Sequence, residues 1–231
     1  MSYKELRKED LETYFIALAN SLKKKTKVKN FSYELIIVGG ASIILNYSFR
    51  DSTIDIDCLD MQEALMNETV NEVGDKFNLP NGWINTDFIE TDSYSPALIQ
   101  YSTFYKTYGN GILTVRTIKD EYLVAMKLKS ARKYKHDYSD IVGIVLANSD
   151  NKQFTFESVI SAIKNLYGGT DCIKSEALLF LKEVFSNKSA SYKEVANIEN
   201  ENKDLLVSLK KTEKIDEKTL DEILKDLNSQ R

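Results

Sequence analysis

A short apolar run that ends directly in two glycines constrains the fold of this chain more than any other feature. Residues 35–38 are all apolar and have the length of a buried strand, and Gly39-Gly40 follows at once. Ala41 to Leu45 then resumes an apolar pattern that fits the start of a helix. The order predicts a strand, a tight glycine turn and a helix, in which backbone N–H groups can closely approach a phosphate chain. The glycine pair alone is weak support, because many strands end in this way.

A second predicted strand, residues 53–59, carries two aspartates one residue apart, Asp55 and Asp57. Residues i and i+2 of a strand point to the same face, so we expect both carboxylates to converge while Ile54, Ile56 and Cys58 pack the other way. Two like charges at this spacing repel each other, and a bound cation is the usual remedy. A solvated strand face would also explain the pair. The combined order of glycine turn, helix and paired aspartates favours a divalent metal ion beside a phosphate chain.

The composition excludes several classes of protein. A chain of 231 residues that is 42% hydrophobic can build a real core in one or two domains. Its 31 basic and 35 acidic residues give a net charge of −4, which argues against a general attraction to nucleic acid. No apolar run approaches the roughly 20 residues of a membrane span. The first residues lack the pattern of a signal peptide, so we expect a cytoplasmic protein with no membrane partner.

The cysteines and the histidine restrict the chemistry further. Cys58 and Cys172 lie far apart, so we expect reduced thiols and neither a disulfide nor a zinc site. A single histidine, His136, leaves little room for a Ser-His-Asp triad or a multi-histidine metal site. We expect it to be a surface loop residue.

The periodicity predicts an α+β fold in which a small mixed sheet flanked by helices precedes a helical C-terminal region. We expect two domains, 1–150 and 151–231, the second ending in a charged tail from about Lys193. A hairpin is predicted around Gly109-Asn110-Gly111, with strands at 101–108 and 112–118, and a further short strand is predicted at 83–89. Helices are predicted at 10–22, 41–45, 62–77, 121–132, 138–146, 156–166, 175–185, 192–210 and 219–227.

In its glycine turn and its aspartate pair, the chain resembles the nucleotidyltransferase superfamily. It is more closely similar to the AbiEii- and MenT-like toxins of type IV toxin–antitoxin systems. The resemblance covers about residues 33–146. It is carried by Gly39-Gly40-Ala41, Arg50, Thr53, Asp55-Ile56-Asp57, Trp83-Ile84-Asn85, the segment 122–132 and the segment 137–141.

The resemblance implies an enzyme that uses Mg²⁺ or Mn²⁺ to move a nucleoside monophosphate from an NTP to an acceptor. The acceptor would be RNA, such as tRNA, or a protein hydroxyl, and a cognate antitoxin would be a partner. The implied catalytic residues are Asp55, Asp57, Lys127 and Asp140. The implied nucleotide-binding residues are Gly39, Gly40, Ser42, Arg50, Thr53, Lys127 and Arg132.

Lys127 is surrounded by apolar neighbours in the sequence, so it needs an anionic partner if it is buried. The resemblance implies a nucleotide phosphate, and the alternative is a side chain that reaches solvent along its apolar stem. Asp137 and Asp140 have two interpretations as well. They could cap and charge the start of the helix at 138–146. With the resemblance, we expect them to orient Lys127 or Arg132.

The chain departs from the family pattern in two places. The segment Lys133–His136 makes the connection before Asp137 about two residues longer than usual, and the strand at 112–118 carries no acid, only Arg116. Asp87 is the best substitute for a third metal-binding carboxylate, ahead of Glu90 and Asp92. A nucleotide-binding module without catalysis, acting as an interaction protein, therefore remains an alternative.

The lysine runs at Lys23–Lys29 and Lys127–His136 could form a basic rim for RNA, and the first run holds five lysines within seven residues. A solvated basic face explains the same run equally well.

Overall fold

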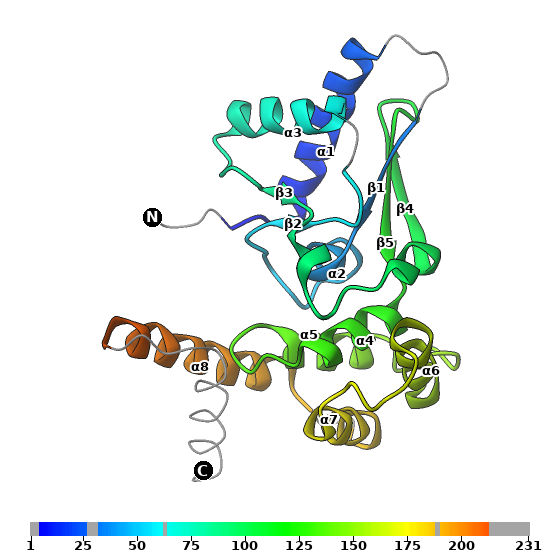
Figure 1. Ribbon diagram of the computed structural model, residues 1–231, viewed down its shortest axis with the longest axis vertical. Helices are drawn as coiled ribbons and strands as arrows, with labels where there is room; N and C mark the ends of the chain where they lie inside the picture. Colours follow the sequence, from blue (N-terminus) through cyan, green and yellow to red (C-terminus); the bar gives the residue numbers. More distant parts are fainter. Residues whose placement is uncertain (1–4, 27–31, 62–63, 188–189, 213–231) are drawn as a thin grey trace.

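The structure is a computed structural model that describes residues 5–26, 32–61, 64–187 and 190–212 (Figure 1). It confirms the predicted α+β class. The strands and the helices α1 (Lys8–Lys25) and α3 (Ala64–Phe77) form one part, and helices from α4 (Asp120–Ser130) onward form a second layer. No helix in the described part of the chain is long and apolar enough to cross a bilayer.

The main sheet has three strands in the order β1-β5-β4, with bounds Tyr33–Ile37, Leu113–Ile118 and Ser102–Tyr108. β1 and β5 run parallel, whereas β4 and β5 form the predicted antiparallel hairpin. Gly109, Asn110 and Gly111 all adopt positive φ, which explains why the turn carries these residues. α1 packs against β4, β5 and α3, so the buried positions of β1 and β5 share a core with these helices.

The strand predicted at 53–59 is much shorter than expected. β2 contains only Ile56–Asp57 and pairs in parallel with β3, Ile84–Asn85. Thr53 and Cys58 instead form isolated bridges to Leu6 and Ile37. The expectation that Ile54 packs beneath the strand is wrong, because this side chain is 45% exposed, whereas Ile56 and Cys58 are buried. The backbone pairs with three different segments within six residues, and such non-local pairing leaves no trace in the local pattern.

The helices follow the predicted periodicity closely. α2 already begins at Gly39, so the glycine pair forms the first turn of the helix and not a separate loop. The helix expected at 219–227, together with Lys27 and Lys29, lies outside the described residues. The bounds not yet given are α2 Gly39–Asn46, α5 Asp137–Ala147, α6 Phe156–Tyr167, α7 Ser175–Ser186, α8 Tyr192–Thr212 and two 3₁₀ helices, Asp87–Glu90 and Pro96–Tyr101.

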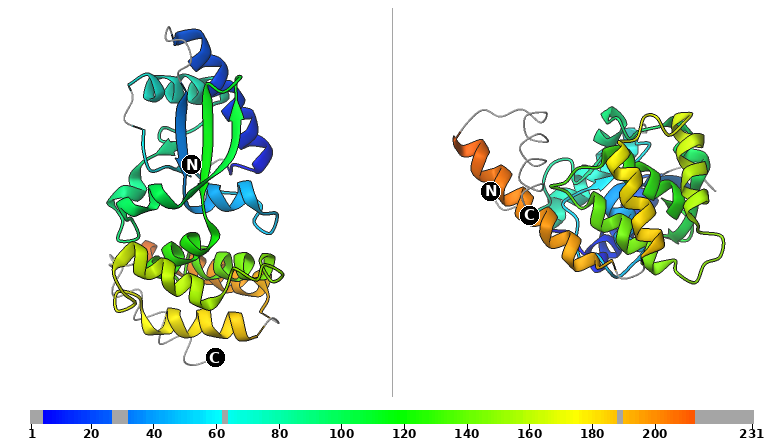
Figure 2. Two further views of the ribbon diagram at one scale, coloured as in Figure 1. Left: turned by 90° about the vertical axis from the view of Figure 1, so that its right-hand side faces the viewer. Right: turned by 90° about the horizontal axis from the view of Figure 1, so that it is seen from below.

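Figure 2 shows the helical layer beneath the strands, with α4 and α5 nearest to them. α4 packs against α5 and α6, and α5 packs against α7 and α8, around a second hydrophobic core. This core contains residues from both sides of residue 150. The domain division expected at that point stays a prediction. The start of α2, the segment 50–57 and the α4–α5 connection meet between the two layers, and the candidate site lies there.

Candidate active site

The first turn of α2 lies directly beside Asp57. The backbone N–H of Val38 donates a hydrogen bond to the carbonyl of Asp57 at 2.9 Å, which ties β2 to the end of β1. Gly39 has φ +62°, and a Cβ at this position would lie 3.2 Å from Asp57 Oδ2. Val38 caps α2 without a side-chain hydrogen bond, and the first N–H groups of a helix have no partner within it. A carboxylate therefore lies next to a helix N-terminus that can bind an anion.

Asp55 and Asp57 influence each other electrostatically. Burial raises the pKa of Asp57 to about 6, and repulsion by Asp55 and Asp87 adds to the increase, against the attraction of Lys127. Burial also raises the pKa of Asp55, and Asp87 again adds to it, although Lys135 and Arg50 act in the opposite direction. The three acids thus share one region whose negative charge is incompletely balanced. Perturbed acids of this kind are typical of functional sites.

The described residues contain no group of three or more His, Cys, Asp or Glu side chains arranged to hold a metal ion. Asp87, the predicted third ligand, is exposed at the start of a 3₁₀ helix and acts on Asp55 and Asp57 through its charge. Its role as a metal ligand stays a prediction.

Gly40 makes room for the side chains that enclose the other side of this turn. A Cβ on Gly40 would lie 2.7 Å from Nη2 of Arg50 and 2.8 Å from Oγ1 of Thr53. Arg50 is anchored from two directions, since its Nε donates to the carbonyl of Ser52 at 3.1 Å and its Nη1 to Oδ2 of Asp140 at 2.6 Å. The predicted residues Gly40, Arg50 and Thr53 therefore do lie together, and the absence of a side chain at Gly40 permits their approach.

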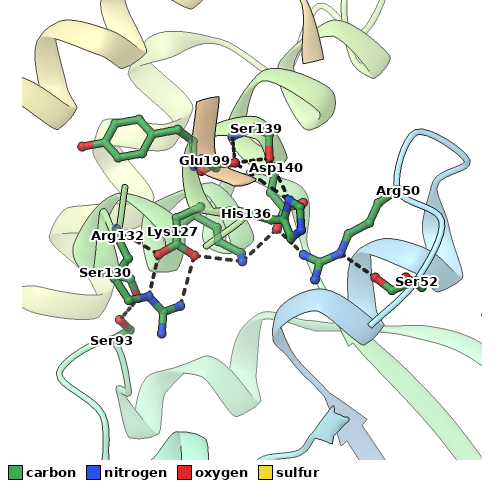
Figure 3. A network of polar contacts seen from close by, with 12 residues as sticks. Arg50, Ser52, Ser93, Lys127, Ser130, Arg132, His136, Ser139, Asp140 and Glu199 are labelled. Atoms are coloured by element: carbon green, nitrogen blue, oxygen red, sulfur yellow. Dashed lines mark hydrogen bonds and ion pairs between the residues drawn. The ribbon is translucent and has the colours of Figure 1, made fainter. Parts of the chain in front are cut away.

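Lys127 lies between two fully buried carboxylates (Figure 3). Its Nζ is 3.0 Å from Oδ1 of Asp137 and 2.8 Å from Oδ2 of Asp140. Burial by itself would lower the pKa of this ammonium group, but Asp140 and Asp137 outweigh burial and raise the pKa above its ordinary value. The interpretation in which Lys127 reaches solvent is wrong, because the residue is only 9% exposed.

Asp137 also binds Arg132, through three hydrogen bonds. The backbone N–H of Arg132 donates to Oδ2 at 3.1 Å, its Nε to the same oxygen at 2.8 Å and its Nη2 to Oδ1 at 3.1 Å. The expected orientation of Lys127 and Arg132 by Asp137 and Asp140 is thus confirmed. Asp137 is the first residue of α5, but its hydrogen bonds go to these cations.

Asp140 joins Lys127 to Arg50 through its Oδ2 atom. Its other oxygen, Oδ1, is buried without a hydrogen-bond partner among the described residues, so Asp140 can accept one further bond. Three cationic side chains, those of Arg50, Lys127 and Arg132, therefore share two buried carboxylates, which leaves one positive charge in excess.

Ser42 does not join this group. It is fully buried, and its hydroxyl lies 3.4 Å from the backbone N of Ile118, from which it accepts a hydrogen bond, so we assign it to the fold. Both cysteines are free, as expected, and Cys58 is buried with its thiol donating to the carbonyl of Asn85. His136 is half-buried in the α4–α5 loop, where it precedes α5.

Two residues outside the predicted set of catalytic, nucleotide-binding and metal-binding residues border the site, and the sequence had indicated only the first of them, as part of the basic run Lys127–His136. Lys135 is exposed on the α4–α5 loop and attracts both Asp55 and Asp57. Glu199 of α8 is 3% exposed and accepts hydrogen bonds from the first turn of α5. A signal for Glu199 was present, because it lies between Ala196 and Leu206 on the buried stripe of α8, where an apolar residue is expected.

The assembled site contains two half-buried acids, Asp55 and Asp57, together with a helix N-terminus and a set of cations, and this combination suits a polyphosphate bound with a metal ion. A search of curated proteins and a search of solved structures gave no match to the chain. Residues 14–180 match a family described as "Nucleotidyltransferase of unknown function (DUF6036)". This match agrees with the expected superfamily, whereas the closer similarity to AbiEii- and MenT-like toxins stays a prediction. Because the matched segment spans more than half of the chain, the protein belongs to this family of nucleotidyltransferases of unknown function.

Proposed function

We propose that this protein is a metal-dependent nucleotidyltransferase that moves a nucleoside monophosphate from an NTP to an acceptor hydroxyl. The observation that carries the proposal is the position of the Asp57 carboxylate beside Gly39 at the N-terminus of α2, with Asp55 close enough to repel it. A phosphate binds at a helix N-terminus. A divalent cation is bound by carboxylates, and here both elements are adjacent.

The donor set fits Mg²⁺ or Mn²⁺. Asp55 and Asp57 would hold the ion, because hard cations prefer oxygen ligands and because these two acids are half-buried and repel each other. Mg²⁺ usually takes only one or two carboxylates and completes its shell with water and substrate phosphates, so two acids suffice. When bound, the ion would neutralise charge on the phosphates of the NTP.

The cations of the site would bind and orient the triphosphate. The side chain of Arg132 is 35% exposed, and Lys135 is exposed, so both can reach a ligand. Arg50 and Lys127 are more deeply buried and would act by their charge and by holding Asp140. Gly39 and Gly40 would present their backbone N–H groups to the phosphates, next to the side chains of Asp57 and Arg50.

In the proposed reaction an acceptor hydroxyl oxygen attacks the α-phosphorus. The bond from the α-phosphorus to the oxygen that bridges to the β-phosphate breaks, and pyrophosphate leaves. The hydroxyl proton passes to a site carboxylate or to solvent. Positioning and charge stabilisation supply most of the catalysis in such displacements.

The acceptor that we propose is RNA, such as tRNA, with a protein hydroxyl as the alternative, and the protein would act as the toxin of a toxin–antitoxin pair. Arg132 and Lys135 lie close enough to Asp57 and Asp55 to interact with their charges, and both would attract an RNA backbone at this site. The lysine run near residue 25 offers weaker support, because Lys25 is paired at 2.7 Å with both Glu68 and Glu72.

A nucleotide-binding module without catalysis is a second candidate. It is favoured by the lack of a group of three ligating side chains among the described residues. The test is incubation of the protein with each NTP, Mg²⁺ and total RNA or cell extract, followed by measurement of pyrophosphate and of label on the acceptor. Release of pyrophosphate that is lost in Asp55→Ala supports the enzyme. Tight NTP binding without pyrophosphate release supports the binding module.

A further inference from the structure

We propose that α8 is a positioning element of the candidate active site. Glu199 and Asn202 hold the α4–α5 loop and the first turn of α5, and thereby set where Arg132 and Lys135 face the aspartate pair. The part of this inference that concerns nucleotide binding rests on the proposed function, whereas the mechanical coupling of α8 to the loop does not.

Glu199 supplies the cap that α5 lacks from its own sequence. His136, the residue before α5, makes no side-chain cap hydrogen bond. Glu199 instead accepts from the backbone N–H of Tyr138 at 2.8 Å and from that of Ser139 at 3.4 Å. It also accepts from the hydroxyl of Ser139 at 2.5 Å. A helix N-terminus is thus capped by a carboxyl group that is 60 residues away in the chain.

Asn202, one turn further along α8, holds the loop itself. Its Nδ2 donates to the carbonyl of Lys133 at 2.8 Å, and the residue is only 9% exposed. Lys133 lies between Arg132, which binds Asp137, and Lys135, which attracts Asp55 and Asp57. The two contacts of α8 therefore clamp both ends of the segment that carries the exposed cations.

The same two contacts reach the buried ion network. Ser139, which Glu199 binds, is followed directly by Asp140, and Asp140 holds both Lys127 and Arg50. Figure 3 shows Glu199 next to Ser139 and His136 on one side of this network. A shift of α8 would move the first turn of α5, and with it the carboxylate that positions these cations.

Burying the polar side chains of Glu199 and Asn202 costs free energy, which residues that served only to pack the helix would avoid. Within residues 192–209 of α8, the part whose burial the structure describes, the buried residues are Ala196, Glu199, Asn202 and Leu206, so two of these four positions are polar. Burial raises the pKa of Glu199 to about 8, against the hydrogen bonds from Ser139 and Tyr138. A protein with apolar residues at such buried positions is often as stable as one with charged or polar residues there, or more stable. α8 also lies beyond residues 14–180, so Glu199 and Asn202 are outside the segment that matches the family.

The loop can be followed without any activity assay. It contains three trypsin sites, Arg132, Lys133 and Lys135, and the only histidine of the chain, His136, whose ring gives a single set of NMR signals. Asn202→Ala and Glu199→Ala remove one clamp each, while Glu199→Gln keeps an acceptor for the Tyr138 N–H. Asn200→Ala and Glu194→Gln are the matched controls, because both side chains are exposed on the same helix.

We expect Glu199→Ala and Asn202→Ala to speed trypsin cleavage in the loop about five- to tenfold, the effect of losing one cap on a local opening equilibrium. The His136 signals should shift or broaden, and KM for the NTP should rise several-fold with a smaller change in kcat. Glu199→Gln should restore part of each effect, and the controls should resemble the wild type.

Unchanged cleavage and unchanged His136 signals in Glu199→Ala and Asn202→Ala would overturn the inference. The inference would also be overturned if the variants lowered only the global stability, so that cleavage in the loop rose in proportion to the unfolded fraction. If the wild type binds no NTP, the proposed function fails, and the trypsin and His136 results still decide whether α8 holds the loop. A loosened loop with unchanged NTP affinity would overturn the link to the site.

Discussion

Replacement of Lys127 by methionine tests whether the ion network is a structural unit. The ammonium of Lys127 lies 3.0 Å from Asp137 and 2.8 Å from Asp140, and both carboxylates are 0% exposed. Lys127→Met keeps a long apolar stem and removes only the charge. It leaves two buried carboxylates with one cation fewer between them.

The expected loss can be worked out from these contacts. Removing one partner of a buried ion pair costs about 3–5 kcal/mol. Asp137 keeps Arg132 and Asp140 keeps Arg50, so we expect the lower end, about 3 kcal/mol. For a chain of this size, 1 kcal/mol shifts Tm by about 2–4 °C, so Tm should fall by about 6–12 °C.

The assay is thermal and urea unfolding at several pH values, with Lys129→Met as the control. Lys129 lies on the same helix, donates a hydrogen bond to the carbonyl of Cys172 and lies over the ring of Tyr167, so its replacement leaves the buried carboxylates untouched. Burial by itself would raise the pKa of Asp137, but Lys127 and Arg132 hold it well below its usual range. This stabilisation is complete above the unfolded value of about 4 and is lost as the pH falls below it, so the two proteins should converge in acid.

A Tm equal to that of the control would refute this reasoning. If NTP affinity fell sharply at the same time, the ammonium of Lys127 would be a direct phosphate ligand and not the centre of the network.

Three further predictions concern the acids and the glycine turn. Asp57→Asn should abolish transfer yet raise Tm at neutral pH, because it removes an acid that burial and neighbouring charges disfavour. The difference in Tm from the wild type should appear as the pH rises from about 4 to about 6, and an equal Tm at all pH values would contradict the raised pKa of Asp57. Asp55→Ala should abolish transfer with an unchanged circular dichroism spectrum, since Asp55 lies outside the hydrophobic core; a lost fold would assign it a structural role. Gly40→Ala should displace the guanidinium of Arg50 from Asp140 and weaken NTP binding, and unchanged calorimetric affinity would show that this approach is unimportant.

The local pattern was sufficient for most of the fold. The hairpin around Asn110 and the helices from α4 onward follow directly from turn residues and apolar periodicity. A strand was predicted at 53–59, but the short bounds of β2 could not be, because its two residues pair with β3 while Thr53 and Cys58 pair with segments before it. Strand pairings this short depend on which distant segment lies next to them in the folded chain, and the local sequence does not contain that information.

The candidate site was predictable in part. The apolar surroundings of Lys127 correctly indicated a buried cation that needs an anion, but only the tertiary structure identifies Asp137 and Asp140 as its partners. Ser42 was expected to bind the nucleotide because the resemblance implied it, yet its hydroxyl accepts a hydrogen bond from the backbone N–H of Ile118. Glu199 acts across 60 residues, so only its polar character on a buried stripe could have revealed it.

The most direct test of the central claim compares two labels on the same NTP. The protein, Mg²⁺ and total RNA are incubated with NTP labelled at either the α- or the γ-phosphate, and Asp55→Ala and Asp57→Asn serve as controls. Nucleotidyl transfer predicts label on the acceptor from the α-position only, labelled pyrophosphate from the γ-position, and neither product with the variants. Acceptor labelled from the γ-position, or α-label transferred equally well by Asp57→Asn, would contradict the account.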